Sequence, residues 1–154
     1  MDDPQHLTRL GNVWLKQPVY FITTCIAARR PLLAQPTVHA ILREEWQGLR
    51  SRHGWMVGAY MIMPDHVHFF AAPVPEEARP LSHVMAKWKE WSAKRILKTT
   101  GTTAPLWQPE FFDHVLRSES SRTEKWNYLR ENPVRAGLVA QAEAWPFTGH
   151  IDFP

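Results

Sequence analysis

The residues of this chain best suited to chemistry are two histidines that stand one residue apart. They are His66 and His68, within residues 63–73 (MPDHVHFFAAP), and an apolar run follows them. Residues i and i+2 of a β-strand share a face, so the two imidazoles would project together while Val67 points to the opposite face. Such a pair can bind one divalent cation, and with nitrogen and oxygen ligands it admits Mg²⁺ or Mn²⁺ as well as Zn²⁺ and other transition metals. The pair alone does not name the metal, and ordinary histidines on a half-exposed strand face are the alternative.

A tyrosine and an asparagine form a second candidate group, in residues 126–132 (WNYLREN). On a helix, Tyr128 and Asn132 would be neighbours on one face, while Trp126 and Leu129 would form a separate apolar stripe. A phenol, whose ordinary pKa is about 10, is a poor nucleophile, but a metal that polarises a phosphate makes it competent for phosphodiester transesterification. Asn132 could complete the metal shell. The alternative is a packed tyrosine followed by an asparagine that caps its own helix.

Basic residues are concentrated between positions 81 and 98, where five lysines and arginines accompany one acid. One face of a predicted helix there combines cations with an aromatic ring, at spacings of 4, 3 and 4: Lys87, Trp91, Lys94 and Lys98. Single-stranded nucleic acid is bound by this mixture of charge for phosphates and a ring for an unstacked base. A solvated helix face with a half-buried tryptophan is the alternative. Three further residues are candidates for phosphate contacts near the tyrosine: Arg117, Arg130 and Arg135.

The elements that must position these groups alternate between strand and helix. Apolar and β-branched runs predict strands over 18–26, 55–63, 67–72 and 111–117, and apolar periodicity predicts helices over 36–53 and 81–98. A third helix is expected from Ser121, which has capping-box spacing with Glu124. We therefore expect an α+β fold with a ferredoxin-like βαββαβ antiparallel sheet, and an additional C-terminal helix that carries the tyrosine.

The whole chain of 154 residues fits one domain, with a core over about 18–140 and a short C-terminal tail that should pack back on it. Its longest apolar run, residues 55–63, is far shorter than the roughly 20 residues of a membrane-spanning helix. The N-terminus lacks the layout of a signal peptide, so we expect a cytoplasmic protein without a membrane partner. The net charge of +3 permits binding to nucleic acid. Cys25 is the only cysteine, which excludes an intramolecular disulfide and a metal cluster built on cysteines.

Asp65, and the neighbouring pair Asp113 and His114, allow more than one interpretation. Asp65 could orient a metal-bound imidazole, but its position between a proline and a strand favours a turn former. Asp113 and His114 are adjacent in a predicted strand, so only one of them could face the metal, and both are interpreted as structural.

Several motifs together resemble a known family. PDHVH at 64–68 and YLRENPVRAGLV at 128–139 are similar to the signatures of the REP-associated tyrosine transposases, the chromosomal branch of the HUH single-strand transposases. Shorter similar stretches are PVYFITT at 18–24, RPLLA at 30–34, LWQ at 106–108 and FDHVLR at 112–117. The resemblance covers roughly residues 18–140, and the two main signatures at this separation make it specific.

The resemblance implies an activity and a site. His66 and His68 would be the HUH pair that binds Mg²⁺ or Mn²⁺, Asn132 the third ligand, and Tyr128 the nucleophile that forms a 5′-phosphotyrosine and frees a 3′-hydroxyl. The partner would be single-stranded or hairpin DNA from palindromic repeats, nicked and rejoined by a monomer or a dimer. Two other interpretations stay open: a hairpin-binding module with little or no turnover, and a histidine-ligated metal nuclease that uses water.

Overall fold

A single five-stranded antiparallel sheet organises the protein in the computed structural model, which describes residues 18–154. Its strand order is β4-β1-β3-β2-β5. The strands are β1 Val19–Cys25, β2 Trp55–Ile62, β3 His66–Pro73, β4 Phe112–Leu116 and β5 Thr148–His150. The N-terminal stretch without a signal-peptide layout lies outside the described residues. In the part of the chain that the structure describes, no helix is long and apolar enough to span a membrane.

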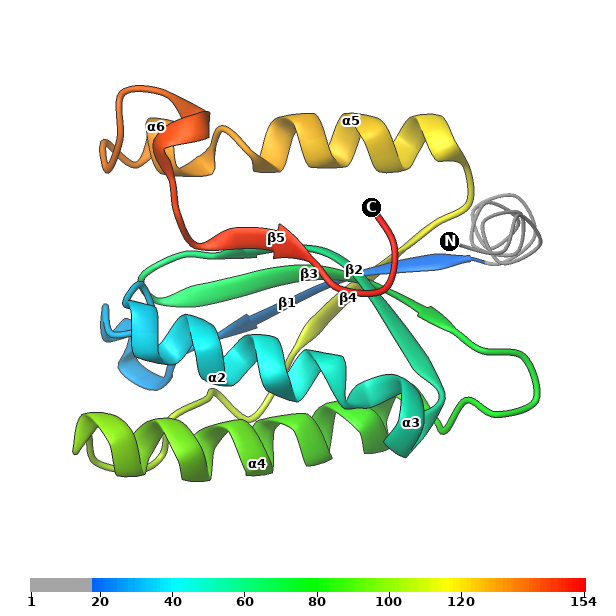
Figure 1. The fold of residues 1–154 in the computed structure, drawn as a ribbon, viewed down its shortest axis with the longest axis horizontal. Helices are drawn as coiled ribbons and strands as arrows, with labels where there is room; N and C mark the ends of the chain where they lie inside the picture. Colours follow the sequence, from blue (N-terminus) through cyan, green and yellow to red (C-terminus); the bar gives the residue numbers. More distant parts are fainter. Residues whose placement is uncertain (1–17) are drawn as a thin grey trace, which may run out of the picture.

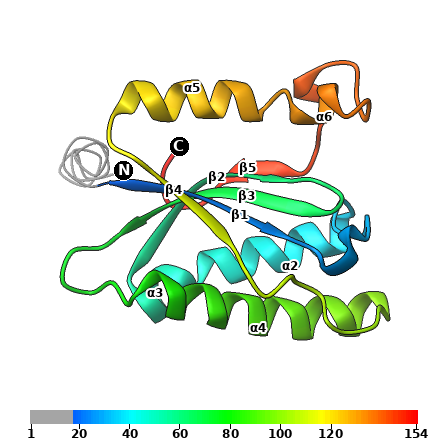
Figure 2. The same cartoon turned by 180° about the vertical axis from the view of Figure 1, so that it is seen from behind.

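Helices cover both faces of the sheet, as Figure 1 and the reverse view in Figure 2 show. One face carries α2 Pro36–Gln47, α3 Leu49–His53 and α4 Leu81–Thr100, and the other carries α5 Glu119–Leu129 and α6 Asn132–Arg135. Two short 3₁₀ turns complete the set, η1 Ala27–Arg29 and η2 Ala142–Ala144. The first four strands, with α2 and α4, follow the βαββαβ order expected from the sequence.

Strand alternation divides the apolar side chains into two cores, one on each face of the sheet. On β3, Val67, Phe69 and Ala71 belong to the core that α2 and α4 cover. Phe70 and Ala72 point the other way, into a core shared with Leu129 and Trp126 of α5 and with Trp145. The predicted apolar stripe of the tyrosine helix is therefore confirmed: Leu129 is fully buried, and the Trp126 ring lies 6.3 Å from that of Phe70.

Two predicted helices differ from those in the structure. The helix expected over 36–53 is split at Gly48 into α2 and α3, and Gly54 ends the pair with a left-handed φ of 73°. The third helix begins at Glu119 and not at Ser121, because Ser118 leaves β4 in an extended conformation and acts as the N-cap. The Ser118 hydroxyl accepts the backbone N–H of Ser121 at 3.1 Å.

The same helix also ends earlier than the motif suggested, at Leu129, and a separate helical turn, α6, starts at Asn132. Pro133 has no N–H to donate to the carbonyl of Leu129, so the α-helical ladder cannot continue through it. Tyr128 and Asn132 consequently do not lie on one face of a continuous helix, and that prediction was wrong.

The C-terminal tail packs back on the body, as expected. Trp145 is buried, and its indole N–H donates to the carbonyl of Ile62 at 3.0 Å. Beyond it the chain forms β5, a strand that was not predicted and that pairs with the free edge of β2. Phe153 is then buried against Gly58, where a Cβ would lie only 2.3 Å from the phenylalanine ring.

Candidate functional site

The two-residue turn ahead of β3 is held firmly by backbone hydrogen bonds. Met63 donates to the carbonyl of His66 at 2.8 Å, which closes the predicted hairpin between β2 and β3. Two segments from elsewhere also donate to the turn: Ile26 to the carbonyl of Asp65 and Leu33 to that of Pro64, each at 2.9 Å. The start of β3, and with it the first histidine, is therefore fixed from three sides.

His66 and His68 project from the same face of β3, as their spacing predicts. Their ring centroids lie 4.8 Å apart, and the rings are nearly perpendicular, at 83°. Each ring uses its Nδ1 in a hydrogen bond of 2.7 Å, His66 with the Asp65 carboxylate and His68 with the Thr23 hydroxyl. The pairing of Nδ1 with these oxygens leaves Nε2 as the ring nitrogen with which each histidine can bind a ligand.

Asp65 is the residue that orients His66, a role that the sequence had ranked below that of a turn former. One carboxylate oxygen accepts from His66, and the other accepts from Arg29 Nε at 2.8 Å. Partial burial acts to raise the pKa of the Asp65 carboxyl, but hydrogen bonds from His66 and Arg29 outweigh it and hold that pKa below its ordinary value. Thr23 was missed altogether, because only the register of β1 against β3 places it opposite His68.

His68 is kept in its neutral form by its surroundings. Burial is the main cause, and electrostatic repulsion from His66, Lys125 and Arg29 adds to it, so that the pKa of His68 falls to about 3. The ring also stacks on Phe21, with centroids 5.2 Å apart. An imidazole that stays unprotonated at physiological pH retains the lone pair that a metal ion requires.

Helix α5 brings a cation and the tyrosine to this same face of the sheet. The Lys125 ammonium lies 5.0 Å from the centroid of Phe21, the ring that stacks on His68. Tyr128 follows one turn later with 66% of its surface exposed, so its phenol is open to a large substrate. With Lys125, it lines a hollow of about 300 Å³ whose floor includes His114 of β4.

His114 was interpreted as structural, and the structure places it in the hollow beside Tyr128. It pairs with Phe21 across β1 and β4, so it shares the face on which Phe21 meets His68. Asp113 pairs with Ile22, whose side chain belongs to the core on the other face. The prediction that only one of the two neighbours could face the site is therefore confirmed, and His114 is that residue.

Asn132 is held by an arginine. Arg135 donates to the Asn132 side-chain oxygen and, at 2.8 Å, to the backbone carbonyl of Tyr128. Its guanidinium also lies 4.0 Å from the centroid of the Tyr128 ring. Arg135 thus links the tyrosine to the turn that follows its helix, and it is the one of the three candidate arginines in contact with both motif residues.

Comparison with known proteins assigns the family. Residues 15–131, more than half of the chain, match the family model described as IS200-like transposase. The chain belongs to the IS200-like transposase family. It is therefore classed among the transposases, which are enzymes.

Individual relatives agree with this assignment. A REP-associated tyrosine transposase of Escherichia coli strain K12 is 27% identical over 147 residues, which cover 95% of this chain and 85% of the relative. A solved structure of a REP-associated tyrosine transposase bound to a REP hairpin has a TM-score of 0.68 at 26% identity, covering 88% of this chain and 78% of that one. A second solved structure, from Deinococcus radiodurans, shares the fold, with a TM-score of 0.56 at 19% identity and coverage of 77% and 92%.

The donor set of this IS200-like transposase fits a divalent cation. Two imidazoles present Nε2 from one strand face, with their Nδ1 atoms already oriented by oxygen partners. Within residues 18–154, no group of three or more histidine, cysteine, aspartate or glutamate side chains is arranged to hold a metal. A metal on the pair would therefore take its remaining ligands from an amide oxygen, from water or from the substrate.

The remaining predicted DNA contacts are not gathered at the histidine pair. Arg130 forms an ion pair of 2.8 Å with Glu143, and Arg117 is exposed just beyond the end of β4. The predicted basic face lies on α4, which covers the opposite face of the sheet from α5, as Figure 2 shows. Lys87, Trp91, Lys94 and Lys98 are therefore separated from Tyr128 by the sheet itself.

Proposed function

We propose that this IS200-like transposase nicks and rejoins single-stranded DNA at hairpins of palindromic repeats, through a 5′-phosphotyrosine on Tyr128. The observation that carries the proposal is that α5, the helix that carries the exposed Tyr128, covers the sheet face from which both imidazoles project. The relative solved with a REP hairpin supports the choice of substrate. The neutral state of His68, and the hydrogen bonds that orient both rings through Nδ1, support a metal-dependent reaction.

His66 and His68 would hold the cation, Mg²⁺ or Mn²⁺, and Asn132 would supply a third ligand by exchanging its bond with Arg135 for the ion. When bound, such an ion would polarise the phosphate and favour attack on phosphorus. The Lys125 ammonium, beside Phe21 and one turn before Tyr128, would attract the same phosphate.

The proposed step conserves the number of phosphodiester bonds. The Tyr128 oxygen forms a bond to phosphorus, the bond from phosphorus to the 3′-oxygen breaks, and that oxygen leaves as a 3′-hydroxyl after taking up a proton. Rejoining is the reverse, in which a 3′-hydroxyl attacks the phosphotyrosine and the phenol leaves. No external energy source is needed, because the tyrosine ester stores the bond that was broken.

Covalent trapping tests the proposal. Purified protein is incubated with Mn²⁺ or Mg²⁺ and a hairpin oligonucleotide copied from palindromic repeats beside its gene, and the products are separated on a denaturing gel. A label at the 3′ end of the DNA should move with the protein, while a label at the 5′ end should appear on a shorter free strand. EDTA should abolish both products.

Each of the two alternative functions predicts a different pattern of products on the gel. A hairpin-binding module would retard the DNA on a native gel and leave it intact under denaturing conditions with either metal. A nuclease that uses water would shorten the DNA without retaining any label on the protein. Retention of the 5′ label would reverse the proposed polarity of attack.

Asp65 should control metal affinity without touching the metal. Replacing it with asparagine removes the charge that orients the His66 ring and pairs with Arg29. We expect Asp65→Asn to weaken Mn²⁺ binding by about 10- to 100-fold, measured by isothermal titration calorimetry on the protein without DNA. Asp113→Asn is the matched control, since it makes the same chemical change on β4 at a residue whose partner Ile22 faces the other core. Equal affinities for the two variants would contradict the orienting role.

A further inference from the structure

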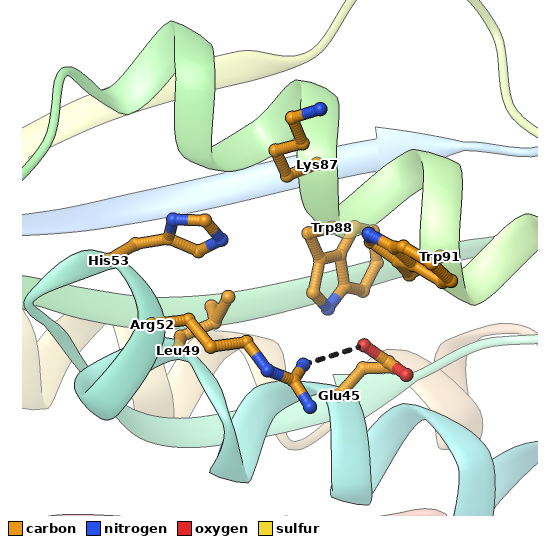
Figure 3. A pocket seen from close by; sticks show the side chains of 7 residues that line it. All are labelled: Glu45, Leu49, Arg52, His53, Lys87, Trp88 and Trp91. Atoms are coloured by element: carbon orange, nitrogen blue, oxygen red, sulfur yellow. Dashed lines mark hydrogen bonds and ion pairs between the residues drawn. The ribbon is translucent and has the colours of Figure 1, made fainter.

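A second cavity lies on the other face of the sheet, between α3 and the first half of α4. It has a volume of about 390 Å³, and Figure 3 shows the side chains from α2, α3 and α4 that line it. Its lining includes Glu45, Arg52, His53, Lys87, Trp88 and Trp91. Because α4 and α5 cover opposite faces of the sheet, this cavity is separate from the hollow beside Tyr128.

Two cations from different helices line the cavity, Arg52 of α3 and Lys87 of α4. The pKa of His53 is lowered first by burial and then by electrostatic repulsion from its neighbours His83, Arg52, Arg79 and Lys87. The rings of His53 and His83 lie 5.5 Å apart. Arg52, Arg79 and Lys87 are cationic side chains near the His53 ring, and positive charge favours an anion.

The acid of the cavity offsets the charge of Arg52, to which it is paired, but it forms no ion pair with Lys87. Glu45 is buried, and its two carboxylate oxygens are taken up by different arginines, Arg52 at 3.3 Å and Arg95 at 3.1 Å. Arg95 approaches from the far side and also binds Glu44 at 2.5 Å. Lys87 is exposed, and its ion pair with Glu90 is long, at 3.5 Å, so its ammonium remains accessible to an incoming anion.

Tryptophans provide the other chemistry of the cavity. Trp91 is 51% exposed, and the Lys94 ammonium lies 4.6 Å from its ring centroid. Trp88 is fully buried, and its indole N–H has no hydrogen-bond partner. The cavity thus places an open aromatic ring, Trp91, in the same hollow as two cations, Arg52 and Lys87.

We propose that this cavity binds single-stranded DNA, with a phosphate on Arg52 and Lys87 and an unpaired base against Trp91. The proposal rests on the proposed function, which supplies DNA as the substrate, and it assigns a second contact surface for that substrate. An acidic peptide would satisfy the cations but would leave the ring without a planar partner, and paired DNA keeps its base faces stacked. Since the sheet separates the cavity from Tyr128, the nucleotide bound here is not the one that is cut.

Binding experiments in EDTA test the cavity without any DNA cleavage. The probe is a fluorescent single-stranded oligothymidine, and its affinity is followed by anisotropy over a range of salt concentrations. Trp91→Ala should weaken binding by about tenfold, whereas Trp91→Phe, which keeps a ring, should retain most of the affinity. Lys87→Gln should reduce the slope of log affinity against log salt by about 0.7, and Lys87→Arg should preserve it.

Photocrosslinking locates the base on the unaltered protein and does not depend on the folding of any variant. An oligonucleotide with 5-iododeoxyuridine should crosslink to the peptide that contains Trp91, as identified by mass spectrometry. Crosslinks confined to other peptides, or equal affinity of Trp91→Ala and the wild type, would overturn the proposal. The proposal would also be overturned if polyglutamate displaced the oligonucleotide and the Trp91 substitution did not change the affinity. That result would indicate a site for acidic peptides.

The outcome is independent of the nicking assay. If the oligonucleotide crosslinks to Trp91 but no covalent adduct between protein and DNA forms in the presence of metal, DNA binding in the cavity is supported and the proposed reaction is contradicted. If the adduct forms and Trp91→Ala binds normally, the reaction stands and the cavity proposal fails.

Discussion

Tyr128→Phe should abolish the covalent adduct with hairpin DNA while leaving hairpin affinity within about twofold of the wild type. The substitution removes only the phenolic oxygen, so the ring can still lie beneath the Arg135 guanidinium. A phenylalanine has no atom that can bond to phosphorus, and we expect adduct formation to fall at least about a thousandfold. The measurement is the denaturing gel with 3′-labelled DNA, accompanied by a binding titration.

A matched tyrosine serves as the control for this substitution. Tyr20 lies on β1, edge-on to Trp55 at 5.3 Å and packed against the core of the α2 and α4 face. Tyr20→Phe makes the same change on the other side of the sheet and should leave the adduct intact. An adduct formed by Tyr128→Phe at the wild-type rate would show that another residue is the nucleophile.

His66→Ala combined with His68→Ala should eliminate both metal binding and nicking. The two imidazoles are the only nitrogen ligands proposed, and their removal leaves an amide oxygen and water around the cation. We expect the affinity for Mn²⁺ to fall by at least about a hundredfold, with the adduct lost at millimolar Mn²⁺. Calorimetry measures the first effect and the denaturing gel the second.

His150→Ala is the control for loss of a histidine, because His150 is exposed on β5, beside β2. It should bind Mn²⁺ like the wild type. The single variants refine the test: each should lose most of the affinity, since one imidazole does not chelate. If the double variant still bound Mn²⁺ tightly and formed the adduct, the functional metal would lie elsewhere in the protein.

Local periodicity accounts for the parts of the site that could be predicted. The period-two alternation of β3 places His66 and His68 on one face, whatever the rest of the chain does. The helical spacing of Trp126 and Leu129 likewise sets which side of α5 is buried, and this leaves Tyr128 outside. Pro133 shows where prediction from residue spacing fails. Its missing N–H interrupts the helix, so Tyr128 and Asn132, four residues apart, do not share a face of one helix.

Contacts between distant segments decided what the sequence did not reveal. Thr23 and His68 are 45 residues apart, and Arg29 and Asp65 are 36 apart, so their bonds exist only because β1 pairs with β3. The position of His114 beside the tyrosine likewise depends on the pairing of β4 with β1.

The side of the sheet on which each helix packs is also a tertiary property. The basic face of α4 has the composition expected for DNA binding, but no pattern within it tells which face of the sheet the helix will cover. The structure places it across the sheet from Tyr128, beside α3 and its arginines. By itself, the sequence determined which side chains share a strand or helix face, because that depends on backbone periodicity. Only the tertiary structure decided which faces meet, because that depends on strand order and on the burial of two separate cores.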